Sequence, residues 1–445
     1  MSVTAPPDGH RVAAAASLHG ELVLPGDKSI SHRALMLALL AGGTSRITGA
    51  GDGDDVRSTA RIVEALGGGV ERRPGEAGNV DYAVRGTGLE GLRQPDAPLD
   101  CGNSGTTMRL FAGILAGRQM QAILDGDASL RRRPMARIVE PLRAMGAHLE
   151  GMHGERPPLI VVGRSPLRHI DWMTPVASAQ VKSAILLAAL DADGTTTVRE
   201  GVATRDHTER MLRARGALVR SLADGGGGNI VEVEGPAALR PVDQLVPGDV
   251  SAAAFWLVAG AIHPDAELRL RGVGVNPTRR AVIDLLRRMG ASIDEAGPGD
   301  DGVGEPTADL VARSSELRAI DVHAGETAAA IDEIPVLCLA ATQASGRTVI
   351  RGAGELRHKE SDRIAGIVAG LRALGARIDG VGDDIVIEGP AALRGSVVDS
   401  LGDHRLALTF AIAGLVAGDV TTIKGADSVA ISYPGFFADL ERIQS

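Results

Sequence analysis

A lysine, an arginine and two serines lie at the opening of an Ala/Leu-rich run near the N-terminus, in the segment GDKSISHR at residues 26–33. Cations and hydroxyls before a helix are suited to binding a small anion, because the helix N-terminus has unpaired N–H groups and a positive dipole end. The segment is not a nucleotide-binding P-loop, since that template would need glycine at Leu22 and at Asp27. We therefore expect an anion other than a nucleoside triphosphate here.

Openings of this kind recur six times along the chain, each with a polar loop, an Ala/Leu-rich helix, a Gly-containing turn and a β-branched strand. They are PGDKSISHRALMLALLAG at Pro25, DCGNSGTTMRLFAGILAG at Asp100, PVASAQVKSAILLAAL at Pro175, PGDVSAAAFWLVAGAI at Pro247, IDEIPVLCLAATQASG at Ile331 and LGDHRLALTFAIAGLVAG at Leu401. A fixed period of this kind is typical of a structural repeat.

The loops and the starts of the second helices carry the residues that could do chemistry. They are Lys28, Ser29, Arg33, Asn103, Thr106, Arg109, Arg133, Ser178, Gln180, Lys182, Arg205, Asp332, Glu333, Lys359, Glu360, Arg363, Asp403, His404 and Arg405. Singly, each has a structural alternative: Lys28 and Arg33 as solvated charges, Asp332 as a helix N-cap. Their repetition at equivalent positions favours a small, multiply anionic ligand, for which arginine is the natural fork.

A second helix follows in each complete repeat and must position these loops. Apolar residues lie on one helix face over residues 135–145 and over residues 364–374, and the sequences ALGG, RAMG, RRMG and RALG indicate glycine C-caps. The unit is therefore β-α-β-α-β-β, with the sixth copy truncated. We predict an α/β fold of two domains with three repeats each, one over residues 26–246 and the other over 1–25 plus 247–445. The Gly- and Asp-rich stretch Asp294–Glu316 is expected to be a surface loop.

Composition excludes several classes of function. The formal net charge of −9 disfavours nucleic acid as a partner. Two cysteines, Cys101 and Cys338, support neither a disulfide framework nor a zinc site, and both are expected to be small packed residues. The start of the chain lacks a secretory pattern, and the longest apolar run, Ala252–Ile262, is too short to span a bilayer. We expect a cytoplasmic protein with no membrane partner.

Six motifs in order resemble the 5-enolpyruvylshikimate-3-phosphate synthase family: GDKSISHRAL, GNSGTTMR, ASAQVKSAILLAAL, IDEIPVL, RHKESDRI and GDHRLAL. The resemblance runs from about Leu22 to Phe436. It implies two domains built as inside-out α/β barrels, an active site in the interdomain cleft, an N-terminal strand that belongs with the second domain, and a monomer without metal or cofactor. The implied reaction transfers the enolpyruvyl group of phosphoenolpyruvate to the 5-hydroxyl of shikimate 3-phosphate and releases phosphate, in the shikimate pathway to chorismate and aromatic amino acids.

The resemblance also implies roles for individual residues. Catalysis falls to Lys28, Asp332 as the base at the hydroxyl and Glu360 as the acid at carbon. The residues implied for shikimate 3-phosphate are Lys28, Ser29, Arg33, Ser178, Ala179, Gln180, Arg205, Asp332 and Lys359. Those implied for phosphoenolpyruvate are Lys28, Asn103, Gly105, Arg133, Gln180, Glu360, Arg363, His404 and Arg405.

Two positions depart from the family pattern. Ile431 stands where many members have lysine, so the phosphoenolpyruvate cluster lacks one cation unless Arg205 or Lys424 compensates, and Leu110 replaces a common proline. Gly105 is retained, and a small residue there goes with glyphosate sensitivity in the family. Three alternatives stay open: a sister enolpyruvyl transferase acting on UDP-N-acetylglucosamine, a non-catalytic phosphometabolite-binding protein, and a nucleic-acid-end enzyme of similar repeat architecture.

Overall fold

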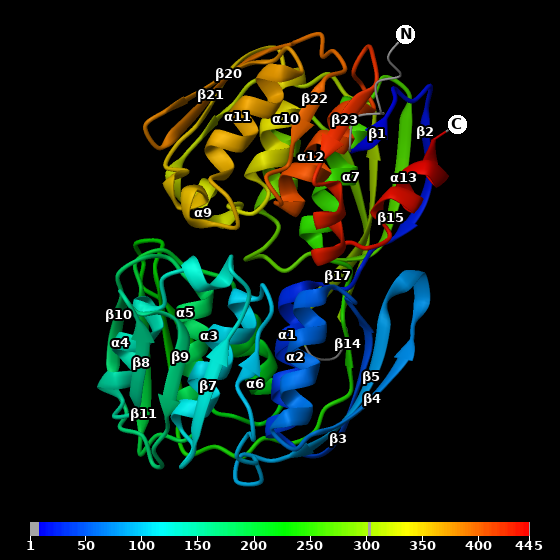
Figure 1. Ribbon diagram of the computed structural model, residues 1–445. Helices are drawn as coiled ribbons and strands as arrows, with labels where there is room; N and C mark the ends of the chain where they lie inside the picture. The colour runs from blue at the N-terminus through cyan, green and yellow to red at the C-terminus, as the bar shows by residue number, and fades with distance from the viewer. Residues whose placement is uncertain (1–8, 301–303, 445) are drawn as a thin grey trace, which may run out of the picture. The chain divides into compact units, whose positions relative to one another are not determined.

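The computed structural model describes residues 9–300 and 304–444, which form two compact α/β units (Figure 1). The N-terminal unit contains residues 25–247, Asp300 and 304–306. The C-terminal unit contains residues 9–24, 248–299 and 307–444. Each unit has its own hydrophobic core.

The N-terminal unit contains three four-stranded sheets. The first has the order β14 (Gln244–Leu245), β3 (Gly42–Ala50), β5 (Val80–Thr87) and β4 (Gly69–Pro74). The second has the order β6 (Leu99–Asp100), β7 (Gln121–Asp125), β9 (Arg156–Val162) and β8 (His148–Met152). The third has the order β10 (Asp171–Thr174), β11 (Thr195–Glu200), β13 (Asn229–Glu234) and β12 (Val219–Ala223). Within each sheet a parallel pair is extended by antiparallel strands, as the β-α-β-α-β-β unit requires.

Helices form the interior of this unit. The first helix of each repeat is buried along nearly its whole length: α1 (Lys28–Leu40), α3 (Gly105–Ala116) and α5 (Ala179–Ala189). The second helices bury one face each: α2 (Asp54–Ala65), α4 (Ala136–Ala144) and α6 (His207–Ala214). A Cβ on Gly113 of α3 would lie 2.2 Å from the carbonyl oxygen of Ala184 in α5, so glycine is what lets the two helices approach. Buried helices inside exposed sheets are an inside-out α/β barrel.

The C-terminal unit also has three sheets. The first has the order β16 (Ser292–Asp300), β17 (Pro306–Arg313), β15 (Ala266–Gly274) and β2 (Leu18–Val23). The second has the order β18 (Asp321–Val322), β19 (Gly346–Ile350), β21 (Asp384–Gly389) and β20 (Arg377–Val381). The third has three strands, β1 (His10–Val12), β23 (Thr421–Lys424) and β22 (Val397–Asp399). In this sheet β1 from the N-terminal segment pairs antiparallel with β23 of the sixth repeat.

The helices of this unit follow the same plan. Those buried along nearly their whole length are α7 (Val250–Ile262), α10 (Ile334–Gln343) and α12 (His404–Gly414). The others are α8 (Ala281–Arg288), the short α9 (Ala324–Ala329), α11 (Arg363–Ala373) and α13 (Phe436–Ile443). Cys101 and Cys338 are buried and free, as expected of small packed residues.

Two strands that directly precede the first helix of a repeat pair with strands that are distant in the sequence. Strand β2 precedes α1 along the chain but pairs in parallel with β15 of the C-terminal unit. Strand β14 precedes α7 but pairs in parallel with β3 of the N-terminal unit. Each strand thereby supplies the first strand of the other unit's repeat, and each lies directly before a loop that holds a capping aspartate, Asp27 or Asp249.

The predicted helix ends are confirmed. The apolar face from Met135 to Met145 is fully buried, and the glycines that follow the second helices have positive φ: Gly67 at 99°, Gly146 at 101°, Gly290 at 99° and Gly375 at 93°. A left-handed backbone conformation at these positions is strained for any residue but glycine, which explains the recurring motif.

The prediction of a surface loop over Asp294–Glu316 is wrong for its described residues. Strands β16 and β17 occupy most of the stretch, and Glu305 is only 1% exposed. Gly- and Asp-rich composition indicated a loop, but sheet pairing and a buried partner for Glu305 override that local preference. Residues 301–303 lie outside the described part of the chain.

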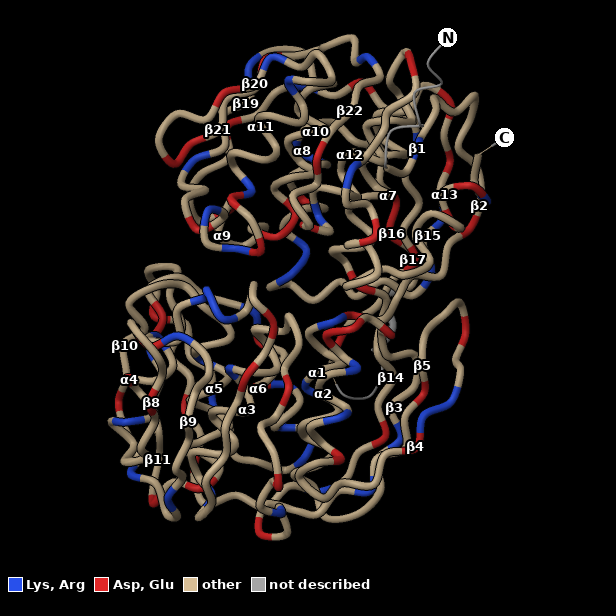
Figure 2. The backbone as a smooth tube through the Cα atoms, viewed as in Figure 1, with Lys and Arg blue, Asp and Glu red and all other residues tan. Residues whose placement is uncertain are grey.

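Charges of both signs are scattered over both units, with Lys and Arg interspersed among Asp and Glu along the backbone (Figure 2). No helix in the described ranges is long and apolar enough to cross a membrane.

Candidate active site

Lys28 is the first residue of α1, and its neighbours hold it in a defined place. Asp27 caps the helix by accepting a hydrogen bond from the backbone N–H of Ile30 at 2.9 Å. The Nζ of Lys28 donates to Oδ2 of Asp55, at the start of α2, over 3.0 Å. The alternative of a freely solvated lysine therefore does not hold in this structure.

Arg33 lies one helical turn further along α1 and is 4% exposed. Its Nε donates to Oγ1 of Thr208 at 2.7 Å, its Nη1 to the carbonyl of Ser29 at 2.9 Å and its Nη2 to Oγ of Ser183 at 2.8 Å. Arg33 thus ties α1 to α5 and α6, and in this conformation its guanidinium is engaged by protein groups.

Burial lowers the pKa of Arg33 to about 10, although nearby carboxylates oppose the shift. The largest opposing charge is Glu209, and Arg205 adds to the lowering. Arg205 is thus close enough to repel Arg33, and a bound phosphate would offset the repulsion between these two guanidinium groups.

The loop before α3 holds Asn103 and Arg133 together. Nη2 of Arg133 donates to Oδ1 of Asn103 at 2.7 Å, and Nδ2 of Asn103 donates to Oδ2 of Asp127 at 2.7 Å. Gly105 begins α3 beside them: a Cβ there would lie 2.7 Å from Nη1 of Arg109 and 3.3 Å from Nη1 of Arg133. The structure thus brings three predicted phosphoenolpyruvate residues together: Asn103, Gly105 and Arg133.

Ser178, Ala179 and Gln180 open α5. The Ser178 hydroxyl caps the helix by accepting from the N–H of Val181 at 3.4 Å, and Ala179 supplies one of the first-turn N–H groups, which lack helical acceptors. Gln180 accepts from Nη1 of Arg109 and donates to Oγ1 of Thr106 at 2.9 Å. This side chain links the loops of the second and third repeats.

Lys182 is fully buried, and its contacts indicate a structural role. Its Nζ lies 2.8 Å from carboxylate oxygens of both Glu200 and Glu209. Burial alone would lower the pKa of Lys182, but the two glutamates raise it above its ordinary value. Lys182 is therefore a charged core residue.

Arg205 is half-buried just before α6, and a buried pair lies beside it. Nδ1 of His207 is 2.8 Å from Oε1 of Glu305, and both side chains are 1% exposed. Nη1 of Arg210 donates to the carbonyl of Gly304. Gly304 and Glu305 are thus held against α6 by His207 and Arg210.

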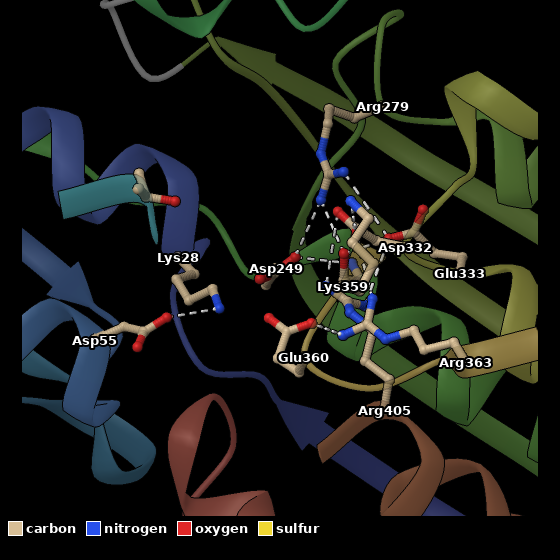
Figure 3. A network of polar contacts seen from close by, with 12 residues as sticks. Lys28, Asp55, Asp249, Arg279, Asp332, Glu333, Lys359, Glu360, Arg363 and Arg405 are labelled. Carbon is tan, nitrogen blue, oxygen red and sulfur yellow. Dashed lines mark hydrogen bonds and ion pairs between the residues drawn. The ribbon is translucent and has the colours of Figure 1, made fainter. Parts of the chain in front are cut away.

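In the C-terminal unit, the predicted charged residues form one cluster (Figure 3). The carboxylate of Asp332 lies 3.4 Å from Nζ of Lys359, 3.5 Å from Nη1 of Arg363 and 4.0 Å from Nη2 of Arg405. Asp332 does not cap the following helix, since the N-cap of α10 is Glu333. The alternative of a capping role for Asp332 is therefore wrong. Its carboxylate instead lies within ion-pair distance of these three cations.

Arg363 joins the second carboxylate of the cluster. Its Nη2 donates to Oε2 of Glu360 at 2.5 Å, and its Nε donates to Oδ2 of Asp403 at 2.7 Å. Burial opposes the charge of Arg363, but Glu360, Asp403 and Asp332 raise its pKa well above the ordinary value. The guanidinium therefore stays charged and holds both proposed acid–base residues, Asp332 and Glu360.

His404 and Arg405 begin α12, where Asp403 is the N-cap and accepts from the backbone N–H of Arg405 at 2.9 Å. Both residues are buried, His404 at 1% and Arg405 at 8% exposure of the whole residue. Ile431, at the position of the missing cation, ends a 3-10 helix over Ala426–Ile431, and Lys424 ends β23.

Sequence reasoning missed several partners. They are Asp55, Asp127, Ser183, Thr208, Ser251, Arg279 and Glu305. For Asp55 a signal existed, because it lies in the acidic run that opens α2, and second-helix starts had already supplied cations. Thr208 and Ser251 carry the same signal, because they lie in the first turns of α6 and α7, whereas Asp127, Ser183, Arg279 and Glu305 carry none.

The predicted residues are divided between the units. The N-terminal unit carries Lys28, Ser29, Arg33, Asn103, Gly105, Arg133, Ser178, Ala179, Gln180 and Arg205, and the C-terminal unit carries Asp332, Lys359, Glu360, Arg363, His404 and Arg405. Helix starts and cations of this kind bind carboxylates and phosphates. Asp332 and Glu360 are two carboxylates held by one arginine, Arg363.

The chain is similar to known proteins over nearly its full length. Residues 12–440 match the family model of EPSP synthase (3-phosphoshikimate 1-carboxyvinyltransferase). A 3-phosphoshikimate 1-carboxyvinyltransferase of Roseiflexus castenholzii is 50% identical over 437 residues, covering 98% of this chain and 99% of the relative. One of Gloeobacter violaceus is 52% identical over 435 residues, covering 97% and 98%.

Solved structures agree. An EPSP synthase from Acinetobacter baumannii superposes with a TM-score of 0.85 at 40% identity, covering 97% of each chain. The enolpyruvyl transferase NikO from Streptomyces tendae has a TM-score of 0.78 at 20% identity, covering 97% of this chain and 96% of NikO, and this likeness shows the shared fold. Together with the charged cluster and the helix-start loops, these matches show that the chain belongs to the EPSP synthase family.

Proposed function

We propose that the chain catalyses transfer of the 1-carboxyvinyl group of phosphoenolpyruvate to the 5-hydroxyl of shikimate 3-phosphate, with release of phosphate. The observation that carries the proposal is the cluster around Arg363, which holds the carboxylates of Asp332 and Glu360 in one constellation. Addition and elimination at an enol ether need one group to take a proton from oxygen and another to exchange a proton at carbon.

Asp332 is the proposed base. It takes the proton of the 5-hydroxyl as the oxygen attacks C2 of phosphoenolpyruvate, while Lys359, at 3.4 Å from the Asp332 carboxylate, keeps that carboxylate oriented toward the shikimate hydroxyls. Glu360 is the proposed acid and gives a proton to the methylene carbon. The product of this step is a tetrahedral intermediate that carries both substrates.

The second step reverses the proton transfer at carbon. Glu360 takes a proton back from the methyl group, the C–O bond to phosphate breaks, and the enol ether forms. Lys28 assists the departing phosphate, and the arginines Arg133, Arg363 and Arg405 stabilise the charges of phosphate and carboxylate. Atoms balance, since one proton leaves the hydroxyl and one is taken up by phosphate.

Shikimate 3-phosphate is proposed to bind through Ser29, Ser178, Ala179, Gln180 and Arg205. The helix-start N–H groups of α5 and the crowded cations Arg33 and Arg205 suit its phosphate. Arg33 contributes by holding α1 against α5 and α6, and through its charge. Phosphoenolpyruvate is assigned to Asn103, Gly105, Arg133, Gln180, His404 and Arg405, so the proposal, like the predicted interdomain active site, requires residues of both units.

One assay tests the proposal. The purified chain is given phosphoenolpyruvate with shikimate 3-phosphate, and phosphate release is followed, with UDP-N-acetylglucosamine as the control acceptor. We expect release with the first acceptor only. Release with the control alone would support the sister transferase, and release with neither would support a binding protein without activity. Cytoplasmic location and a monomeric state are part of the proposal, and light scattering on the purified chain tests the second.

A further inference from the structure

Glu333 is a buried carboxylate directly beside the proposed base, and the proposed function leaves it without a role. It occupies the N-cap position of α10, but its side chain makes no capping hydrogen bond. The aspartates at the same position of α7 and α12, Asp249 and Asp403, do cap their helices. The side chain of Glu333 is therefore used for something other than the helix end.

Its contacts are with a buried polar chain (Figure 3). The hydroxyl of Ser251, in the first turn of α7, donates to Oε1 of Glu333, and Nη2 of Arg279 donates to the same hydroxyl at 2.9 Å. Nη1 of Arg279 lies 3.9 Å from Oε1 of Glu333. Serine therefore connects the arginine to the glutamate through hydrogen bonds.

Arg405 approaches Glu333 from α12. Its Nη1 is 3.8 Å from Oε1 of Glu333, and its Nη2 is 4.0 Å from Oδ2 of Asp332. The guanidinium of Arg405 thus lies between two neighbouring carboxylates, each at ion-pair distance. Its position depends on the balance of attraction between them.

Burial strengthens the electrostatic attraction between Glu333 and its neighbouring arginines. The side chain of Glu333 is fully buried, that of Arg279 is 3% exposed and that of Arg405 is 10% exposed. A charge removed from water must be compensated by opposite charges, and solvent screens such charges little. Arg279 and Arg405 are the cations that compensate Glu333 within the described part of this unit.

We propose that Glu333 is a positioning residue that fixes the guanidinium of Arg405 for phosphoenolpyruvate and keeps it from closing onto Asp332. This inference rests on the proposed function, which assigns Arg405 to phosphoenolpyruvate. Without the charge of Glu333, Asp332 is the one carboxylate that the described residues place within 4.0 Å of Arg405. Arg405 then pairs more closely with Asp332, which weakens phosphoenolpyruvate binding and makes Asp332 a poorer base.

The test is the Glu333→Gln variant, with KM measured separately for both substrates. We expect the KM for phosphoenolpyruvate to rise about tenfold, as for loss of a charge-assisted contact, and the KM for shikimate 3-phosphate to stay within about twofold. Glu333→Asp keeps the charge and should recover part of the loss. Glu388→Gln, at an exposed position of β21, should behave as the parent.

Ser251→Ala provides a second route should Glu333→Gln fail to fold. It removes the hydroxyl between Arg279 and Glu333 but keeps every charge, so we expect a smaller rise, about threefold, again confined to phosphoenolpyruvate. A rise in both KM values together, or an unchanged KM for phosphoenolpyruvate, would overturn the positioning role. The parent chain is assayed in parallel: an inactive parent overturns the proposed function and with it this inference, whereas an active parent with unaffected variants overturns the inference alone.

Discussion

Lys28 and Asp55 form an ion pair of 3.0 Å between the first residue of α1 and the opening of α2. The side chain of Lys28 is 22% exposed and that of Asp55 is 9% exposed, so the pair is shielded from much of the solvent. Asp55 also lies in the first turn of α2, where the helix dipole favours a carboxylate. The ammonium group of the proposed catalytic lysine is therefore held by a partner from the next helix of the same repeat.

The first prediction concerns this pair. Lys28→Met should lower kcat by about 10²–10⁴-fold while the protein stays folded, because it removes a proton-transfer group that is partly exposed at the first residue of α1 and not in the core. Asp55→Asn should leave the lysine in place but weaken the contact that holds its ammonium group. We expect kcat to fall by about tenfold. Asp54→Asn, at the exposed neighbouring position, is the control. Phosphate-release kinetics with circular dichroism of each variant decide this, and full activity of Lys28→Met would contradict the assignment.

Glu360→Gln is the second prediction. The amide keeps the shape of the side chain and a hydrogen-bonding oxygen for Arg363, but it cannot exchange a proton with carbon. We expect kcat to fall by about 10²–10⁴-fold with both KM values little changed. Solvent deuterium incorporation into the methylene group of phosphoenolpyruvate, followed by NMR, should disappear in the same variant. Turnover at the parent rate would refute the role of Glu360 as the acid.

Gly105 carries the third prediction. A Cβ at this position would lie 2.7 Å from Nη1 of Arg109, which is the end of a flexible side chain and can shift. Gly105→Ala should therefore fold normally but displace the guanidinium groups, and raise the KM for phosphoenolpyruvate about tenfold. Gly42→Ala is the control, since a Cβ there meets nothing within 4 Å. Equal KM values for Gly105→Ala and the parent would contradict the prediction.

Gly105 also leads us to expect that glyphosate inhibits the parent enzyme. We expect inhibition to be competitive with phosphoenolpyruvate, because Gly105 and Arg133 are proposed to line one pocket. Initial rates at several concentrations of both compounds measure this. Insensitivity of a parent enzyme with an ordinary KM for phosphoenolpyruvate would show that a glycine here is not sufficient.

Local patterns in the sequence predicted those features of the fold that depend on residues close together along the chain. The apolar faces of α4 and α11 and the glycines that end them follow from a 3.6-residue period and a positive φ, which leave a direct trace in composition. Asp403 could likewise be placed at a helix start. The pairing of β2 and β14 with distant strands has no local cause, and the repeat pattern and the family resemblance predicted a domain crossing for the first of them alone.

Long-range polar contacts could not be predicted. Arg33 bonds to Ser183 and Thr208, which are 150 and 175 residues away along the chain. Glu305 lies in a Gly- and Asp-rich stretch that locally resembles a loop, yet it is buried by a histidine 98 residues distant. Such partners are brought together by folding of the whole unit and have no periodicity that a single sequence could reveal.

The pair of Glu305 and His207 gives a stability prediction. Glu305→Ala removes the one partner that the described structure gives the ring of His207, and leaves a buried imidazole beside the resulting space. We expect a loss of about 1–3 kcal/mol in the free energy of unfolding. Glu316→Ala, at an exposed position after β17, should change little. Urea unfolding of both variants measures the difference, and equal midpoints would show that the buried contact is not stabilising.

Asp403 predicts how stability depends on pH. Burial alone would raise the pKa of Asp403, as does Glu360, but the charge and hydrogen bond of Arg363 together with His404 lower it below the ordinary 3.8. A carboxyl whose pKa is depressed in the folded state stabilises that state fully above its unfolded pKa. This contribution is lost as the pH falls through the folded value.

Asp403→Asn should therefore destabilise the protein by about 3–5 kcal/mol near neutral pH, because it leaves the buried Arg363 with one carboxylate fewer. The difference from the parent should shrink as the pH is lowered below 3.8, where the parent carboxyl itself takes up a proton. Urea midpoints from pH 7 down to about pH 3 measure it, with the exposed Asp419→Asn as the control. A difference that stays constant across this range would mean that Asp403 acts as a helix cap and hydrogen-bond acceptor, and that its charge contributes nothing to holding Arg363.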